Sequence, residues 1–340
     1  MEEATGEPAR RVRSGSRRRT PAAAAPRWAG RRAAGLGGAF VLAAVVLAAQ
    51  IHGLDLTVYR EGALALLGRA GEKDLYDAAL IQTDTRGLPF TYPPFAALLF
   101  VPLALLPEAA ALGIVTALTC LCLVGVAVVV VRYLRASGVL ARAGRWAPGA
   151  VLAAVLLIGV SGPWREGLGF GQINALLMVL ILADLLRSTR LPSGVLIGIA
   201  AGIKLTPLAF GLVFLARRDW RSLALLAASF AATVGVGWAL APRESAIFWL
   251  GALFDASRVG ATADLYNVSL NSIVAQSGLA EALQRPVWVL ASLAVAVVCY
   301  RAIRRADDDG DPVRAIAANA EYYVGYLRSN GGKAPDCAAK

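Results

Sequence analysis

The sequence has 340 residues, of which 57% are hydrophobic and only 17% are charged, and its formal net charge is +11. Soluble domains carry about 45–50% apolar and about 25% charged residues, so this composition excludes an ordinary soluble domain and indicates an all-α polytopic membrane protein. One histidine and four cysteines without metal-ligand or disulfide spacing predict no metal, no cofactor and no disulfide framework.

The N-terminal segment, residues 1–32, holds nine arginines and three glutamates among alanine, proline and serine. We predict a disordered basic segment in the cytoplasm that sets the topology, although it could also bind anionic lipid headgroups. Nucleic-acid binding requires a folded basic module, and none is visible, so no nucleic-acid partner is predicted. The apolar run 33–51 is long for a signal peptide, and we predict that it is a retained first membrane helix.

Further apolar runs lie at about 94–107, 109–131, 147–160, 173–186, 192–216, 222–241 and 286–300. A full span needs about 20 residues, so several runs are too short to be counted by length alone. The arginines after residues 131, 186, 216 and 300 all fall on the cytoplasmic side under two conditions. The run 94–107 must be a short re-entrant or interfacial segment, and 192–216 must break at Lys204–Pro207 and turn back.

Pro207 supports this break because proline lacks the backbone donor of a continuous helix. The sequence thus predicts a multi-pass domain over residues 33–300 in the cell membrane, followed by a polar tail at 301–340. With the N-terminus in the cytoplasm, a set of polar residues converges on the external face. The candidates are Asp55, Tyr59, Arg60, Tyr92, Gln172, Asn174, Lys204 and Asn271.

Two of these residues carry the chemical argument. Asp55 follows the first apolar run, and a partly buried carboxylate can act as a general base on a hydroxyl. Lys204 lies within an apolar run, where an ionisable residue is costly and can neutralise a phosphate. Together they indicate a lipid-phosphate substrate that enters from the bilayer and an alcohol acceptor that enters from outside.

Each candidate also has an ordinary explanation. Asp55 could be the N-cap of a helix that begins at Leu56, and Lys204 could extend to the membrane interface. Arg165 and Glu166 could form a local surface pair. The remaining ordinary roles are aromatic anchoring at the membrane interface for Tyr59, Tyr92 and Trp164, and helix bridging for Asn174 and Asn271.

Five segments occur in a specific order: DLTVYREGALALLGRAGEKDLYD, FTYPPFAALLFVPLALLP, GFGQINALLMVLILADLL, GIAAGIKLTPLAFGLVFLARRDW and NVSLNS. Each is a weak motif, but their order and spacing are specific. Over roughly residues 33–300 the sequence resembles glycosyltransferase family 87. This family consists of actinobacterial polyprenyl-phosphate-mannose-dependent α-mannosyltransferases of the GT-C class, including enzymes that build phosphatidylinositol mannosides and lipomannan.

The resemblance implies a GT-C-like helical bundle with its active site on the external face. It implies a polyprenyl-phosphate sugar donor, most simply mannose, a glycolipid or lipoglycan acceptor, and inversion without a metal. Asp55 is then the general base, and Lys204, with Arg60, stabilises the leaving phosphate. The residues expected to bind substrate are Tyr59, Tyr92, Gln172, Asn174 and Asn271.

The sequence departs from the family in two places. Val268 replaces an amide in the last motif, and family members continue past the equivalent of residue 300 with further helices and a Ser-Pro-x-Ser-Trp-x-His-His-like motif. We therefore expect a C-terminally truncated or divergent member. Two other functions remain open: a lipid or sugar transporter, which predicts a repeat of the broken helix in both halves, and an inactive membrane scaffold.

Overall fold

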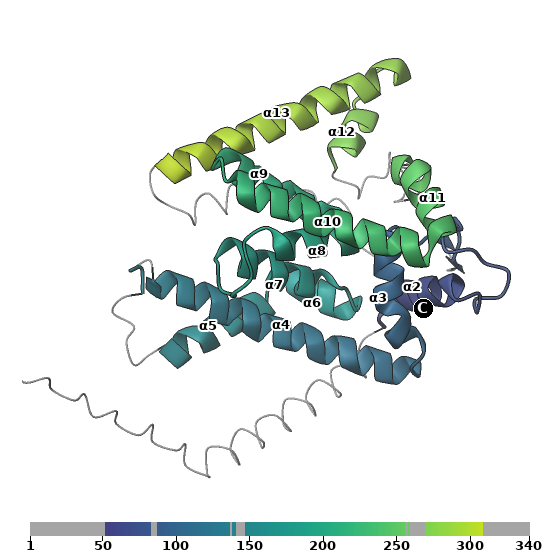
Figure 1. Cartoon of the computed structure of the whole chain (residues 1–340), viewed down its shortest axis with the longest axis horizontal. Coiled ribbons are helices and arrows are strands. Elements are labelled where there is room, and N and C mark those ends of the chain that lie inside the picture. The colour runs from purple at the N-terminus through teal and green to yellow at the C-terminus, as the bar shows by residue number, and fades with distance from the viewer. Residues whose placement is uncertain are drawn as a thin grey trace, which may run out of the picture. The chain divides into compact units, whose positions relative to one another are not determined.

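The computed structural model describes residues 52–82, 87–136, 138–140, 147–255, 258 and 269–308. The predicted basic segment 1–32, the predicted helix 33–51, Val268 and residues 309–340 lie outside the described residues. Most of the described part is helical, which confirms the predicted all-α class (Figure 1). The elements are α2 (Leu54–Leu66), β1 (Ile81–Gln82), β2 (Gly87–Leu88), α3 (Pro94–Ala104), α4 (Glu108–Ala136), α5 (Ala147–Gly159), α6 (Gly162–Gly169), α7 (Asn174–Leu185), α8 (Val195–Ile203), η2 (Thr206–Phe210), α9 (Gly211–Ala216), α10 (Trp220–Leu240), α11 (Pro242–Leu250), η3 (Ala252–Phe254), α12 (Leu270–Gln276) and α13 (Glu281–Asp308).

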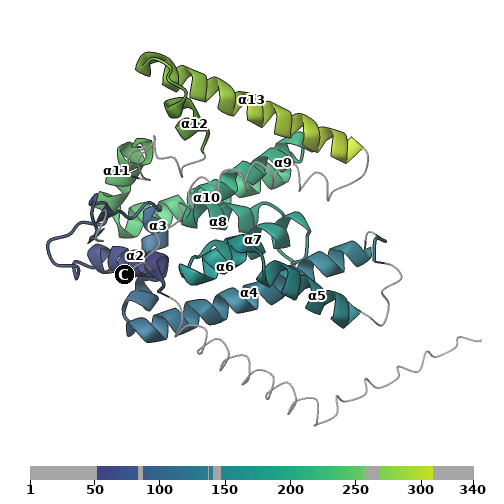
Figure 2. The same cartoon turned by 180° about the vertical axis from the view of Figure 1, so that it is seen from behind.

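Three described helices, α4, α10 and α13, are long and apolar enough to cross a membrane. A fourth crossing results if α5 and α6, which are bent by 69° to each other, form one span. Figure 2 shows α4 alongside α7, with α5 beside α4. The short helix α3 ends at Ala104 and is separate from α4, which confirms that 94–107 and 109–131 are different segments. Helix α13 extends beyond the predicted run at both ends, so residue 300 lies inside a helix.

The predicted break at Lys204 is confirmed. Helix α8 ends at Ile203, and Lys204 has extended backbone angles of −146° and 129°. The 3-10 helix η2 and the short helix α9 follow, with Pro207 in the first turn of η2. Ile197 of α8 packs in one apolar cluster with Phe214 of α9, although Lys204 lies between them in sequence. The chain therefore turns back after Lys204.

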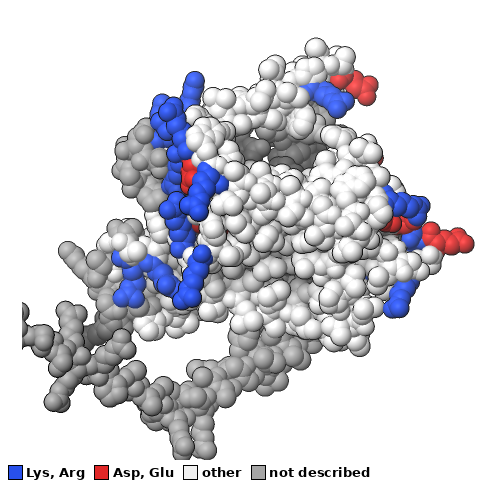
Figure 3. All heavy atoms as spheres, viewed as in Figure 1, with Lys and Arg blue, Asp and Glu red and all other residues white. Residues whose placement is uncertain are grey.

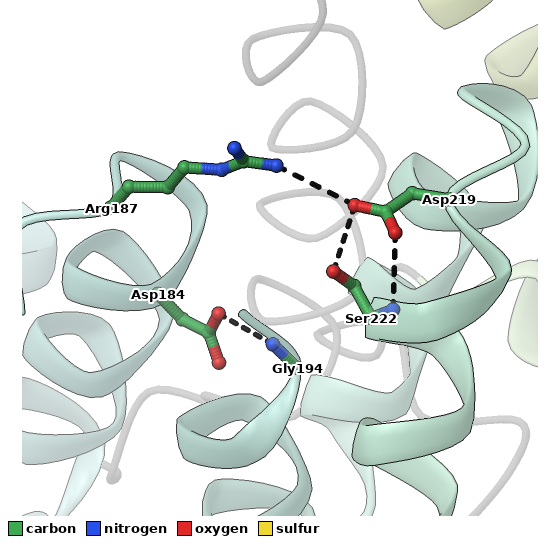
Figure 4. Close-up of polar contacts among 5 residues, drawn as sticks. All are labelled: Asp184, Arg187, Gly194, Asp219 and Ser222. Carbon is green, nitrogen blue, oxygen red and sulfur yellow. Dashed lines mark hydrogen bonds and ion pairs between the residues drawn. The ribbon is translucent and has the colours of Figure 1, made fainter. Parts of the chain in front are cut away.

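Both ends of this re-entrant segment lie together (Figure 4). The buried carboxylate of Asp184, at the end of α7, accepts hydrogen bonds from the backbone N–H groups of Gly194 (2.6 Å) and Ile197 (3.0 Å) at the start of α8. A side chain at Gly194 would overlap the carbonyl of Ser222, at the start of α10. The segment from Gly194 to Ser222 thus leaves one end of the helical domain and returns to it.

Glycines hold α8 directly against α10. Gly198 faces Leu226 and the side chain of Ser229, and Gly202 faces Thr233, so closely that a Cβ at either glycine would overlap its neighbours. Small residues every fourth position allow two helix backbones to approach closely inside a membrane. This packing accounts for the Gly-x-x-x-Gly part of the motif that precedes Lys204.

On the face drawn in Figure 3, charged side chains gather towards two opposite ends, with an uncharged band between them. At one end Arg187 pairs with Asp219 at 3.5 Å, and Asp219 caps the start of α10. At the other end, just past α10, Arg243 binds Asp74 through two contacts of 2.9 and 3.1 Å. The 21 residues of α10 span about 31 Å, which matches the roughly 30 Å hydrocarbon core of a bilayer.

Candidate functional site

Asp55 lies in the first turn of α2 and does not cap the helix. Helix α2 begins at Leu54, and its N-cap is Gly53, whose φ of +59° lies in the left-handed region that glycine tolerates. The backbone N–H of Asp55 donates to the carbonyl of Phe170 at 2.9 Å. The link between α6 and α7 therefore holds the start of α2 and leaves the Asp55 carboxylate available for another partner.

That partner is Gln172, whose side-chain Nε2 donates to Oδ2 of Asp55 at 2.5 Å. Asn174 Nδ2 donates to Oε1 of Gln172 at 2.6 Å, and Lys204 Nζ donates to Oδ1 of Asn174 at 3.3 Å. Four of the predicted site residues thus form one continuous hydrogen-bonded chain. We call this chain of Asp55, Gln172, Asn174 and Lys204 the relay.

The turn that makes the relay possible is at Gly171. This residue has a φ of +67°, and a side chain there would press on Cβ of Leu56 at 3.1 Å. Glycine is suited to such a position because it lacks a Cβ. Gly171 was not among the predicted site residues, although the glycine pair in GFGQIN is a visible signal of a tight turn.

The environment of Asp55 is suited to a base. Burial raises the pKa of the Asp55 carboxyl, while the hydrogen bond from Gln172 and the positive charge of Lys204 lower it. Burial has the largest effect, so the net shift is upward. A carboxylate with a raised pKa accepts a proton more readily than an ordinary aspartate, provided that it remains ionised at the working pH.

A group of aromatic side chains lies beside the relay. The hydroxyl groups of Tyr59 and Tyr92 are 3.0 Å apart, and the Tyr59 ring stacks on Phe100 at 4.4 Å. Lys204 Nζ lies 5.4 Å from the centre of the Tyr92 ring, and Tyr76 donates to the backbone carbonyl of Tyr92 at 3.0 Å. Tyr59 is only 2% exposed, whereas Tyr92 is half-buried, so Tyr92 is the more accessible of the pair.

The structure places the other two predicted site residues elsewhere. The Arg60 guanidinium donates to the carbonyl groups of Leu103 (2.6 Å) and Leu106 (2.8 Å), at the end of α3. This contact satisfies carbonyl groups that a helix end leaves open. Asn271 lies in α12, which packs mainly against α13 rather than against the helices that carry the relay.

A cavity of about 630 Å³ lies beside α11 and is separate from the relay. It is lined by Ala246, Ile247, Leu250, Gly251, Ala252, Asp255 and Arg258. The Arg258 guanidinium also lies 5.9 Å from the centre of the Tyr76 ring. Among the described residues, no group of three or more His, Cys, Asp and Glu side chains is arranged to hold a metal ion.

Comparison with known proteins identifies the family. The sequence model of glycosyltransferase family 87 matches residues 90–324. A polyprenol-phosphate-mannose-dependent alpha-(1-2)-phosphatidylinositol mannoside mannosyltransferase of Mycobacterium tuberculosis is 34% identical over 279 residues, which cover 79% of this chain and 64% of the relative. A protein of the same description from Mycolicibacterium smegmatis is 35% identical over 260 residues, covering 74% of this chain and 59% of the relative.

A third relative, a polyprenol-phosphate-mannose-dependent alpha-(1-2)-phosphatidylinositol pentamannoside mannosyltransferase of Mycolicibacterium smegmatis, is 37% identical over 223 residues, or 64% of this chain and 50% of the relative. The chain thus spans less than two thirds of the length of these curated relatives. No solved structure matches the chain. The family match covers more than half of the chain, and the relatives agree with it: the chain is a member of glycosyltransferase family 87.

Proposed function

We propose that this chain is a membrane mannosyltransferase that moves mannose from a polyprenyl-phosphate donor to a phosphatidylinositol mannoside or a related glycolipid. The relatives' descriptions suggest the donor and the acceptor class. The observation that carries the proposal is the relay, which connects a half-buried carboxylate to a lysine ammonium through two amides. This pair provides a proton acceptor and a cation for a leaving phosphate.

The proposed reaction is a single displacement that inverts the anomeric carbon. Asp55 takes the proton of the acceptor hydroxyl as that oxygen forms a bond to the anomeric carbon. The bond from this carbon to the donor phosphate oxygen breaks, and the polyprenyl phosphate leaves with the electron pair. Lys204 stabilises the charge that develops on the phosphate, so the proposed step uses no metal ion.

Tyr92 is the proposed wall of the sugar pocket, because its half-exposed ring lies beside Lys204. Tyr59 supports Tyr92 through the contact between their hydroxyl groups. We assign Arg60 a structural role, because its guanidinium is engaged by the end of α3. Asn271 lies on α12 and is not one of the four residues that form the relay, so a substrate contact at Asn271 stays a prediction.

We also propose that the relay faces the outside of the cell. Arginines dominate the end of the domain where α7, α9 and α13 terminate, and basic residues favour the cytoplasmic side. Gly202, two residues before Lys204, contacts Thr233, which lies only about 10 Å from the far end of α10. Lys204 would thus lie in the outer half of the bilayer, within about 10 Å of the end of α10.

A transfer assay tests the proposal. Membranes that contain the chain are given radiolabelled polyprenyl-phosphate-mannose and a phosphatidylinositol mannoside extract, alongside Asp55→Asn. We expect the wild type to label glycolipid, and Asp55→Asn to lose at least about 100-fold in rate, since a general base contributes about 10²–10⁴-fold.

Asp74→Asn is the matched control, because Asp74 is an exposed acid that pairs with Arg243 at the same end of the domain. Its transfer should remain near the wild-type rate. Equal transfer by the wild type and Asp55→Asn would remove Asp55 as the base. Absence of transfer from the folded wild-type chain would favour the transporter or the inactive scaffold.

A further inference from the structure

The hydrogen bonds of the relay have a fixed direction. A lysine ammonium can only donate, and an ionised carboxylate can only accept. Asn174 must therefore turn its oxygen to Lys204 and its nitrogen to Gln172, and Gln172 must turn its nitrogen to Asp55. Lys204 and Asp55, at the two ends of the relay, thus determine the orientation of both amides. Each residue donates a hydrogen bond to the next one in the order Lys204, Asn174, Gln172 and Asp55.

We infer that Gln172 and Asn174 are positioning residues that fix the Asp55 carboxylate and connect it to Lys204. Through this connection, an anionic lipid phosphate bound at Lys204 changes the proton affinity of Asp55. This inference rests on the proposed function of Asp55 and Lys204. It adds a positioning role to the expectation that the two amides bind the sugar, because the nitrogen and the oxygen of each amide each have one relay partner.

The backbone around the relay supports a positioning role. The N–H groups of Gly53 and Asp55 donate to the carbonyl groups of Gly169 (3.2 Å) and Phe170 (2.9 Å), which lie three and two residues before Gln172. The N–H of Gln172 in turn donates to the carbonyl of Gly167 at 2.8 Å. Gln172 and Asp55 are thus held on two segments that are bonded to each other, so their side chains have little freedom to separate.

The charges around Asp55 predict how a phosphate bound at Lys204 would change the pKa of Asp55. In the absence of substrate, the positive charge of Lys204 lowers the pKa of Asp55, which burial has raised. The other titratable group of α2 that faces Asp55 is the Tyr59 phenol, whose own pKa is raised by burial, so it stays neutral. A phosphate anion at Lys204 would offset the lysine charge, and the proton affinity of Asp55 would rise. Asp55 would then be the stronger base when the donor is in place.

The experiment measures the titration of Asp55 without turnover. Full-length chain in detergent is unfolded thermally across a range of pH, and each protein is compared with its Asp55→Asn counterpart. A folded pKa above the unfolded value makes Asp55 lower the free energy of unfolding as pH rises. This loss begins near the unfolded value of about 3.9 and ends at the folded pKa. The upper end of this pH window therefore reports the folded pKa of Asp55.

We expect Lys204→Met, Asn174→Leu and Gln172→Met each to extend the window to higher pH. Farnesyl phosphate, a prenyl phosphate without sugar, should extend it in the wild type and have a much smaller effect in Asn174→Leu. Gln284→Met is the control for the loss of an amide, because Gln284 lies on α13 and donates to the carbonyl of Leu279, away from the relay. It should leave the window unchanged.

An unchanged window in Gln172→Met and Asn174→Leu, or an equal effect of farnesyl phosphate in Asn174→Leu and the wild type, would overturn the inference. In the transfer assay both relay variants should lose about 10- to 100-fold in kcat with little change in the donor KM, as expected for a mispositioned base. The titration tests the positioning role of the relay even if no sugar is transferred. If the titration gives the expected shifts but no sugar is transferred, the result contradicts the proposed function and not the inference about the relay.

Discussion

Tyr59 lies next to the relay, and its proposed role is to support Tyr92 rather than to contact substrate. Its ring is stacked on Phe100 with an angle of 5° between the planes, and its hydroxyl lies 3.0 Å from that of Tyr92. The sequence predicted a substrate contact for both tyrosines. Since Tyr59 is almost fully buried, we assign the contact to Tyr92 and the supporting role to Tyr59.

Tyr59→Phe tests this assignment. The change removes one hydroxyl of a partly buried pair, and a typical internal hydrogen bond contributes about 0.5–1.5 kcal/mol. We expect the free energy of unfolding to fall by about 1 kcal/mol while the transfer rate stays within a few-fold of the wild type. Tyr92→Phe should weaken sugar binding as well. A larger loss of transfer in Tyr59→Phe than in Tyr92→Phe would reverse the two roles.

At the residue scale, the sequence predicted the ends of the relay better than its middle. Asp55 and Lys204 stood out because charges next to or within apolar runs are costly. Gln172 and Asn174 were predicted to bind substrate, but the hydrogen bond between their side chains was not predicted. An amide can donate and accept, so its partners depend on which segments the fold brings together. Here Gln172 comes close to Asp55 because of the turn at Gly171 and the backbone hydrogen bonds between α2 and the α6–α7 link.

At the scale of elements, the positions of the arginines and Pro207 predicted the break at Lys204, but helix α6 was not predicted. Pro207 signals the end of α8 directly, whereas Gly162–Gly169 contains three glycines and a proline, which are poor helix formers. That segment becomes helical in its tertiary setting, where Trp164 is buried. The polar first turn of α13, which starts at Glu281, was missed because hydropathy detects only the apolar part of a helix.

The contact between α8 and α10 makes a direct prediction. A Cβ at Gly198 would lie 2.5 Å from the carbonyl oxygen of Leu226 and would overlap the hydroxyl of Ser229. Because one of these atoms is backbone, Gly198→Ala must push the helices apart, at a cost of about 1–3 kcal/mol or more. Thermal unfolding in detergent should show the loss, and transfer should fall because Lys204 follows α8.

Gly235 on α10 provides the control for this change. It lies in a helix, and a Cβ there meets nothing within 4 Å. Alanine favours a helix over glycine by up to about 1 kcal/mol, so Gly235→Ala should leave stability unchanged or raise it slightly. If Gly198→Ala and Gly235→Ala behaved alike, close packing of α8 on α10 would not be what positions Lys204.

For the whole molecule, the two charged ends and the uncharged band between them predict how the domain sits in the membrane. We place the Arg187–Asp219 end in the cytoplasm and the Asp74–Arg243 end, with the relay, outside. Single-cysteine variants at exposed positions test this orientation: Glu72→Cys at the relay end and Thr189→Cys at the arginine end. They require a background in which the native cysteines are replaced by alanine, namely Cys120, Cys122, Cys299 and Cys337.

A membrane-impermeant maleimide should label Glu72→Cys in intact cells and Thr189→Cys only after the membrane is permeabilised. The reason is the length of α10, whose span of about 31 Å allows its two ends to lie on opposite surfaces of one bilayer. The reverse pattern would place Asp55 and Lys204 in the cytoplasm. An outside donor would then be unable to reach the relay, and the proposed reaction would need a donor on the inner leaflet.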